Sequence, residues 1–156
     1  MLFNDVLRSL RYGLNIDEAK MLDIIQLSQT DTVPTVDELT GYLASEDSPE
    51  HVECSSAVLE GFLNGLITYR RGPSDRAIER VPHLSNNLIL KKLRIAFELQ
   101  ENDLFDIFRH LEFNISKPEL SALFRKEGQK NFRACHDQFL RNFLKGLNIW
   151  IDPSKP

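Results

Sequence analysis

The chain has 156 residues, a formal net charge of −4 and two cysteines, with 42% hydrophobic and 27% charged residues. This composition is typical of a globular protein with one ordinary domain or two very small ones. No segment approaches the roughly twenty apolar residues that a membrane span needs. Two cysteines do not make a disulfide framework, and the first residues mix charges into an apolar pattern, unlike a signal peptide. We therefore expect a cytoplasmic protein that does not enter the membrane.

Every predicted element is a helix. The first has apolar residues at helical spacing from Val6 to Leu14, and Asn4 stands where an N-cap residue would. The second runs through Met21–Ile25, and the third opens with a capping box between Thr35 and Glu38. The fourth, Val58–Leu66, is the most apolar, so we expect it at the centre of the core. No segment alternates with a period of two, which argues against a sheet.

The same pattern then occurs a second time. Seven residues have counterparts 83 positions later, and the first members of these pairs are Asn4, Leu7, Leu10, Arg11, Leu14, Asp23 and Ile24. Nine more have counterparts 81 positions later, starting from Thr35, Glu38, Leu39, Cys54, Leu59, Phe62, Leu63, Gly65 and Leu66. Most counterparts are identical, and the others are similar. We therefore predict an all-α fold of about eight helices, a tandem duplication of a four-helix unit.

The predicted domain organisation has two repeats and a linker. The first repeat covers residues 1–69, the linker 70–85, the second repeat 86–149 and a tail 150–156. Gly-Pro and a high charge density mark the linker as an exposed turn, although a short hairpin of Ile67–Arg71 with Ala77–Val81 is an alternative. A unit of about seventy residues buries only a modest core, so we expect the two repeats to pack on each other with pseudo-twofold symmetry.

Several stretches carry a family resemblance. They are NDVLRSLRYGL, FLNGLI, NNLILKKLRIAF and NFRACHDQFLRNFLKGL, with a basic, Gly-containing linker between the second and third. In this order they resemble the YehS-like family of small bacterial proteins of unknown function, domain of unknown function 1456. The most specific parts are Asn131–Cys135 and Asp137–Arg141. The resemblance covers nearly the whole chain and implies a bacterial source and a tandem-duplicated helical domain, but no catalytic or ligand-binding residue.

Cys54 and Cys135 hold the same place in each repeat, at the start of the fourth helix. A helix N-terminus can activate a thiol, but a small core side chain explains the recurrence without chemistry, and we expect that role. A zinc site of these cysteines with His51 and His136 is an alternative. Adjacent Cys135 and His136 would point about 100° apart on a helix, and cysteine–histidine catalysis lacks an orienting group. We therefore assign no metal, cofactor or catalytic residue.

Two charged pairs also recur. Arg11 with Asp23 in the first repeat corresponds to Arg94 with Asp106 in the second. Because both partners are retained together, the pattern favours a salt bridge between the first and second helices of each repeat. The alternative is a symmetric pair of anion-binding arginines.

Gly65 and Gly146 recur within or at the end of the most apolar helix. Glycine costs about 1 kcal/mol of helix propensity there. We therefore expect a close helix contact or a C-cap, and not a ligand site.

The charge distribution is uneven. Residues 21–69 contain nine acidic residues and no lysine or arginine, whereas residues 70–145 contain 15 basic and 10 acidic residues. The candidate contact residues for an anion or nucleic acid are Arg70, Arg71, Arg76, Arg80, Lys91, Lys92, Arg125, Lys126, Lys130 and Arg133. With no complete catalytic motif, we favour a non-enzymatic binding or regulatory module that contacts a protein partner or itself. Nucleic-acid association through the basic residues is the alternative.

Overall fold

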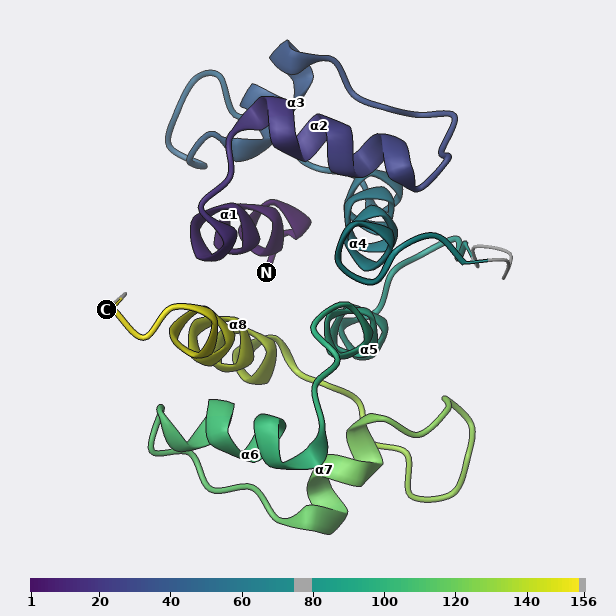
Figure 1. Cartoon of the computed structure of the whole chain (residues 1–156), viewed down its shortest axis with the longest axis vertical. Coiled ribbons are helices and arrows are strands. Elements are labelled where there is room, and N and C mark those ends of the chain that lie inside the picture. The colour runs from purple at the N-terminus through teal and green to yellow at the C-terminus, as the bar shows by residue number, and fades with distance from the viewer. Residues whose placement is uncertain (75–79, 155–156) are drawn as a thin grey trace.

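The computed structural model describes residues 1–74 and 80–154. These residues form eight α-helices, and no strand occurs among them (Figure 1). In chain order the helices are α1 (Phe3–Leu14), α2 (Glu18–Leu27), α3 (Val36–Leu43), α4 (Ser56–Arg71), α5 (Asn86–Ala96), α6 (Glu101–Arg109), α7 (Lys117–Leu123) and α8 (Asp137–Ile151). The all-α fold and its tandem duplication are therefore confirmed.

The predicted capping boxes start α3 and α7. The backbone N–H of Glu38 donates to Oγ1 of Thr35 at 3.1 Å, and the N–H of Thr35 donates to Oε1 of Glu38 at 3.1 Å. The same pair of bonds joins Ser116 and Glu119, at 3.2 and 3.3 Å. Each box satisfies two N–H groups that the first helical turn leaves without partners.

The fourth helix of the first unit is longer than the sequence predicts. α4 continues through Arg71, and Gly72 ends it with a φ of 87° and an N–H that donates to the carbonyl of Thr68 at 2.8 Å. Ile67–Arg71 is therefore helical, and the alternative of a hairpin strand there is wrong. Glycine adopts this positive φ without the steric cost of a Cβ. Most of the second hairpin segment, and Arg76, lie outside the described residues.

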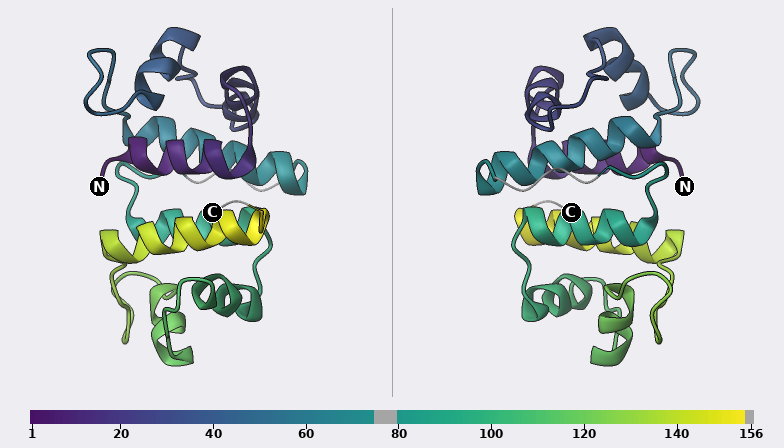
Figure 2. Two further views of the ribbon diagram at one scale, coloured as in Figure 1. Left: turned by 90° about the vertical axis from the view of Figure 1, so that its left-hand side faces the viewer. Right: turned by 90° about the vertical axis from the view of Figure 1, so that its right-hand side faces the viewer.

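The two units pack on each other through their first and fourth helices. α1 lies against α8, and α4 lies against α5, while α2, α3, α6 and α7 cover the outer faces (Figures 1 and 2). Exchanging the units replaces α1 by α5 and α8 by α4. The α1–α8 contact thus becomes the α5–α4 contact, which is the relationship that pseudo-twofold symmetry requires.

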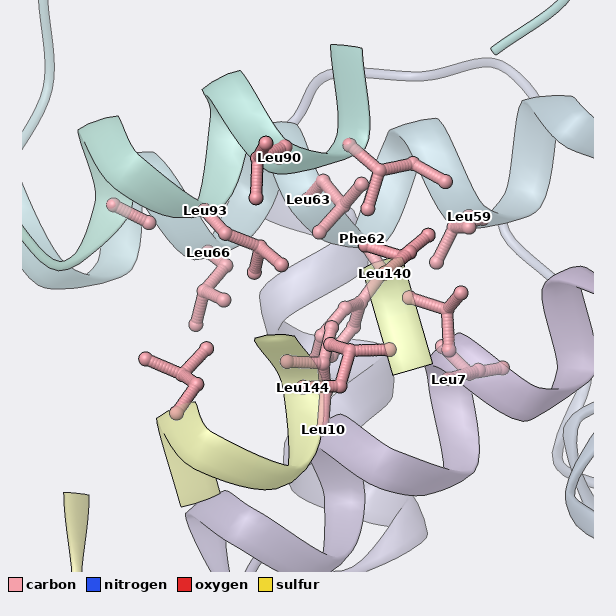
Figure 3. Packing of buried hydrophobic residues seen from close by; sticks show 14 of the residues in the cluster. Leu7, Leu10, Leu59, Phe62, Leu63, Leu66, Leu90, Leu93, Leu140 and Leu144 are labelled. Carbon is pink, nitrogen blue, oxygen red and sulfur yellow. The ribbon is translucent and has the colours of Figure 1, made fainter. Parts of the chain in front are cut away.

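Leucine side chains from both units form the centre of the core (Figure 3). None of the ten labelled residues is more than 3% exposed: Leu7, Leu10, Leu59, Phe62, Leu63, Leu66, Leu90, Leu93, Leu140 and Leu144. Burying each such side chain contributes about 1.5–3 kcal/mol. The fourth helices therefore lie at the centre, as predicted, but they share it with the first helix of each unit.

Gly65 and Gly146 mark close helix contacts. A Cβ at Gly65 would clash with the carbonyl oxygen of Ile24 in α2, and one at Gly146 would lie 2.6 Å from the carbonyl oxygen of Ile107 in α6. Both glycines lie inside their helices and not at a C-cap. The first of the two predicted roles, close approach of helices, is therefore correct.

Candidate functional site

Two equivalent asparagines, Asn4 and Asn87, hold a pair of equivalent loops. Nδ2 of Asn4 donates to the carbonyl oxygens of Tyr42 and Val52, at 3.0 and 2.8 Å, and its Oδ1 accepts the N–H of Cys54 at 2.8 Å. Asn4 lies inside α1, so the predicted N-cap role is wrong. Its side chain instead satisfies the carbonyl of Tyr42, in the last turn of α3, and two backbone groups of the segment between α3 and α4.

Asn87 does the same in the second unit. Its Nδ2 donates to the carbonyl oxygens of Leu123 and Arg133, at 3.0 and 2.8 Å, and its Oδ1 accepts the N–H of Cys135 at 2.8 Å. Each of these partners follows its first-unit counterpart by 81 residues. The two asparagines therefore make the same three anchoring bonds, once in each unit.

The backbone bonds inside the loops are equivalent as well. We call residues 44–53 the acidic loop and residues 125–134, which follow by 81 positions, the basic loop. The acidic loop has three backbone hydrogen bonds of 2.9 to 3.1 Å. In them the N–H groups of Ser48, His51 and Val52 donate to the carbonyl oxygens of Ser45, Ser48 and Gly41, respectively. In the basic loop the corresponding bonds are 3.0 to 3.2 Å long. There the N–H groups of Gln129, Phe132 and Arg133 donate to the carbonyl oxygens of Lys126, Gln129 and Ala122, respectively. The two loops therefore share this set of bonds, although Gly128 and Asn131 have a positive φ and their counterparts Asp47 and Glu50 do not.

The loops carry opposite charge. The acidic loop has no basic residue, and its carboxylates give it a formal charge of −4: Glu46, Asp47, Glu50 and Glu53. The basic loop has one acidic residue, Glu127, and a formal charge of +3 from four basic ones: Arg125, Lys126, Lys130 and Arg133. All nine are exposed, and among the described residues only Arg133 has an ion pair, 3.1 Å from Glu119.

Both loops border one face of the molecule. A cavity of about 480 Å³ opens beside the basic loop, where Glu127 and Phe132 line it, and it reaches the acidic loop only at Glu53. The rings of Phe3 and His83, 5.7 Å apart, contribute to its wall. Both side views show the two loops projecting on the side of the N-terminus (Figure 2). The pseudo-twofold axis therefore runs between the loops, out through this face.

Several of the other predicted basic residues bind their own chain. Nε of Arg70 donates to the carbonyl of Ala96 at 3.1 Å, and Nη2 of Arg80 donates to the carbonyl of Gln29 at 2.7 Å. Both carbonyls lie at or just beyond helix ends, where a cation is favourable.

Two further predicted contact residues have partners in the fold. Arg71 lies 3.6 Å from Glu98, and Nζ of Lys92 donates to Oδ1 of Asn64 at 2.6 Å. Lys91 is exposed on α5, and Arg76 lies outside the described residues. Of the predicted set, the structure therefore gathers only the basic-loop residues into one group.

The cysteines are buried in their own units. Burial raises the pKa of Cys54 to about 12 and that of Cys135 to about 11, because the thiolate is the charged form. Desolvation therefore outweighs the helix N-terminus, and neither thiol is activated. Nδ1 of His51 lies 3.1 Å from the carbonyl oxygen of Ala44. Within residues 1–74 and 80–154 no three histidine, cysteine or acidic residues form a group that could hold a metal.

The predicted salt bridge of the first unit is wrong. Arg11 pairs with Glu18 at 3.4 Å and not with Asp23. Glu18 opens α2 directly after the turn from α1, whereas Asp23 lies more than one turn further along α2 and is exposed. The Arg11 side chain therefore meets the nearer carboxylate.

The second unit departs from the prediction in another way. Nε of Arg94 donates to the carbonyl of Leu99 at 3.1 Å, and its guanidinium lies 4.6 Å from the ring centroid of Phe124. Asp106 pairs with Arg109 at 2.9 Å. Stacking on an aromatic ring replaces the ion pair. Arg11 and Arg94 therefore each serve their own unit, which also argues against a shared anion site.

Two features of this region were not predicted from the sequence. The acidic loop was not matched with the basic one, although a shift of 81 positions places residue 44 on 125 and exposes the reversal of charge. Glu60 was counted with the other carboxylates of residues 21–69 and was not singled out. Glu60 is 5% exposed and accepts the N–H of Val81 through both oxygens, at 3.1 and 3.3 Å. No local signal distinguishes it from the exposed acidic residues.

The fold and these loops define a class: a duplicated all-α protein whose two equivalent loops differ in charge. The chain belongs to the family described as "Protein of unknown function (DUF1456)", whose model matches residues 3–72 and 86–150, one segment in each unit. It is 42% identical over 149 residues to "Uncharacterized protein YehS" of Escherichia coli (strain K12), with 94% of each chain covered. No solved structure matches the chain. Along the described ranges, none of the helices has the length and apolarity to cross a membrane.

Proposed function

We propose that this chain is a non-enzymatic, cytoplasmic binding or regulatory module that recognises a protein partner or a second copy of itself. The observation that carries the proposal is the pair of equivalent loops, held by matching hydrogen bonds, whose exposed charges are opposite. Exposed carboxylates and ammonium groups contribute little to folding. They do favour and orient the approach of a surface of opposite charge.

The arrangement of like charges supports an external partner. The four carboxylates of the acidic loop lie within eight residues of one another, and none has an ion pair in the described part of the chain. Like charges held this close repel one another. A partner that brings opposite charge relieves this repulsion.

Nucleic-acid association is less well supported. Most basic residues of the linker and of α5 are engaged by their own chain, and the acidic loop borders the same face as the basic loop. A nucleic acid lying across this face would meet the acidic loop and be repelled. The alternative therefore rests on the basic loop alone.

Affinity capture of the tagged chain from cells that express it tests the proposal, with and without nuclease. The basic-loop variant, Arg125→Glu with Lys126→Glu and Lys130→Glu, reverses one loop. A control, Lys91→Glu with Lys145→Glu, changes exposed lysines of α5 and α8. We expect nuclease-resistant retention of a defined protein, or of the untagged chain, that the control keeps and the variant loses. Retention that nuclease abolishes would support the nucleic-acid alternative instead, and retention that the variant leaves unchanged would contradict both.

A further inference from the structure

We infer that two copies of this chain associate face to face into a closed, twofold-symmetric dimer, in which the acidic loop of each copy lies against the basic loop of the other. This inference deepens the proposed function, on which it rests, by naming the partner and the surface. The observations behind it are the common face of the two loops, their equivalent places in the two units and their opposite charge.

The geometry follows from the pseudo-twofold axis. That axis relates the acidic loop to the basic loop and runs out through the face that both loops border. A second copy can be turned over onto this face about an axis that lies in the face, perpendicular to the line joining the loops. This rotation places the acidic loop of one copy opposite the basic loop of the other, and it does so at both ends of the contact.

Charge selects this orientation over its competitor. If the second copy turns about the line that joins the loops, each loop faces the same loop of the other copy. The acidic loops then lie opposite each other, and so do the basic loops. The perpendicular axis instead sets a formal −4 against +3 twice. Like charges placed opposite each other are costly, so the sign reversal both attracts the correct copy and rejects the incorrect one. Without that reversal, neither orientation would be favoured.

The same geometry limits the assembly to two copies. Both loops of each copy are used in one isologous contact, so no loop remains free to recruit a third copy. Head-to-tail association through one loop at a time would leave a free acidic loop at one end and a free basic loop at the other, and would grow. The shared face therefore predicts a dimer and not a filament.

Each loop also carries one apolar side chain. Val52 in the acidic loop is 51% exposed, although valine is a residue of the interior. Phe132 in the basic loop is half-buried and lines the cavity beside that loop. One apolar side chain on each loop, surrounded by charges, matches the usual anatomy of an interface with an apolar centre and a polar rim.

Sedimentation velocity of the purified, full-length chain tests the inference. We expect a monomer–dimer equilibrium at about 20 mM salt, where screening is weak, and a dissociation constant at least about tenfold higher at about 300 mM salt. No species larger than the dimer should form as the protein concentration rises. A chain that stays monomeric at all salt concentrations, or that forms a growing series of oligomers, overturns the inference.

Two reciprocal variants make the test specific. The basic-loop variant changes that loop from +3 to −3, and the acidic-loop variant, Glu46→Lys with Asp47→Lys and Glu50→Lys, changes the other loop from −4 to +2. Each variant alone should be monomeric, because its two loops then have the same sign. An equimolar mixture should again form a dimer, while Lys91→Glu with Lys145→Glu should dimerise like the original chain. Circular dichroism checks that every variant is folded.

The outcomes separate this inference from the proposed function. Dimerisation that the loop variants leave unchanged, or variants that fail to pair when mixed, overturn the inference. Loop-dependent capture of a different protein by a monomeric chain also overturns it, but leaves the proposed function intact. Salt-dependent binding of a short RNA or DNA duplex by a monomeric chain, measured by fluorescence anisotropy and lost in the basic-loop variant, overturns both in favour of nucleic-acid association.

Discussion

Asn4 and Asn87 make the same three hydrogen bonds in two units whose loops carry opposite charge. Each side chain donates twice and accepts once, and every partner is a backbone group. Because these bonds involve no side chain of the loop, they fix the loop backbone without restricting its sequence. The charge of the two loops can therefore differ while these anchoring bonds are the same.

Replacing either asparagine by alanine should destabilise the fold. Asn4→Ala leaves two carbonyl oxygens and one N–H without partners, so we expect a loss of about 2–4 kcal/mol in the free energy of unfolding. Asn87→Ala should cost less, because Asn87 is only partly buried. Urea denaturation measures both, and the exposed Asn102 of α6, changed to alanine, is the control. Losses no larger than that of the control would show that the asparagines do not support the loops.

Glycine-to-alanine substitutions in α4 should have opposite effects at two positions one turn apart. Gly65→Ala places a methyl group on the carbonyl oxygen of Ile24, and we expect a loss of about 2–3 kcal/mol in the free energy of unfolding. At Gly61 the nearest atoms lie 3.6 Å from a Cβ, so Gly61→Ala should be neutral or stabilise by up to about 1 kcal/mol. Denaturant unfolding of the pair provides the comparison. Equal effects would argue against the close α2–α4 contact.

The contact between α1 and α8 predicts a rescue. Nδ2 of Asn148 donates to the carbonyl and hydroxyl oxygens of Ser9, at 3.1 and 3.2 Å, and its Oδ1 lies where a Cβ at Gly13 would be. Gly13→Ala should cost about 1–3 kcal/mol in the original chain. In the background of Asn148→Ala its cost should fall to near zero, since the clashing atom is gone. A double-mutant cycle measures this coupling, and additive effects would contradict the contact.

Thiol reactivity should depend on pH as a buried thiol requires. Because burial raises the pKa of Cys54 to about 12 and of Cys135 to about 11, the thiolate fraction at pH 8 is far smaller than for a free thiol of pKa about 8.5. Alkylation by iodoacetamide should therefore be at least about 100-fold slower in the folded chain than in denaturant, and should accelerate only as the pH approaches 11. Each of the variants Cys54→Ala and Cys135→Ala keeps one cysteine, so its alkylation rate belongs to the remaining thiol. Fast alkylation of the folded chain at pH 8 would reveal an activated thiol.

The helices and the duplication were predictable because their signals are local. The capping boxes at Thr35 and Ser116 and the apolar spacing within each helix depend on residues three or four positions apart. The recurrence at 83 and 81 positions needs no structure at all. Gly65 and Gly146 were interpreted correctly for the same reason: a costly residue repeated in an apolar helix indicates a close contact.

The partners of polar side chains were less predictable. Arg11 and Arg94 occupy equivalent positions, yet one pairs with Glu18 and the other stacks on Phe124. Long charged side chains reach several groups of similar energy, so small differences in the neighbourhood decide the contact. Asn4 was misplaced at a helix cap because its true partners lie 38 to 50 residues away.

The sequence by itself determined the helical repeat, its apolar faces, and the difference in charge between the two copies, because these follow from residue types and spacing along the chain. Only the tertiary structure decided that α1 packs on α8 and α4 on α5, and therefore that the acidic and basic loops border the same face. Close packing of the buried leucines of both units stabilises that arrangement. Spacing patterns within single helices do not predict which helices of the two units pack together. The charge difference thus changes from a property of two repeats into a property of one surface.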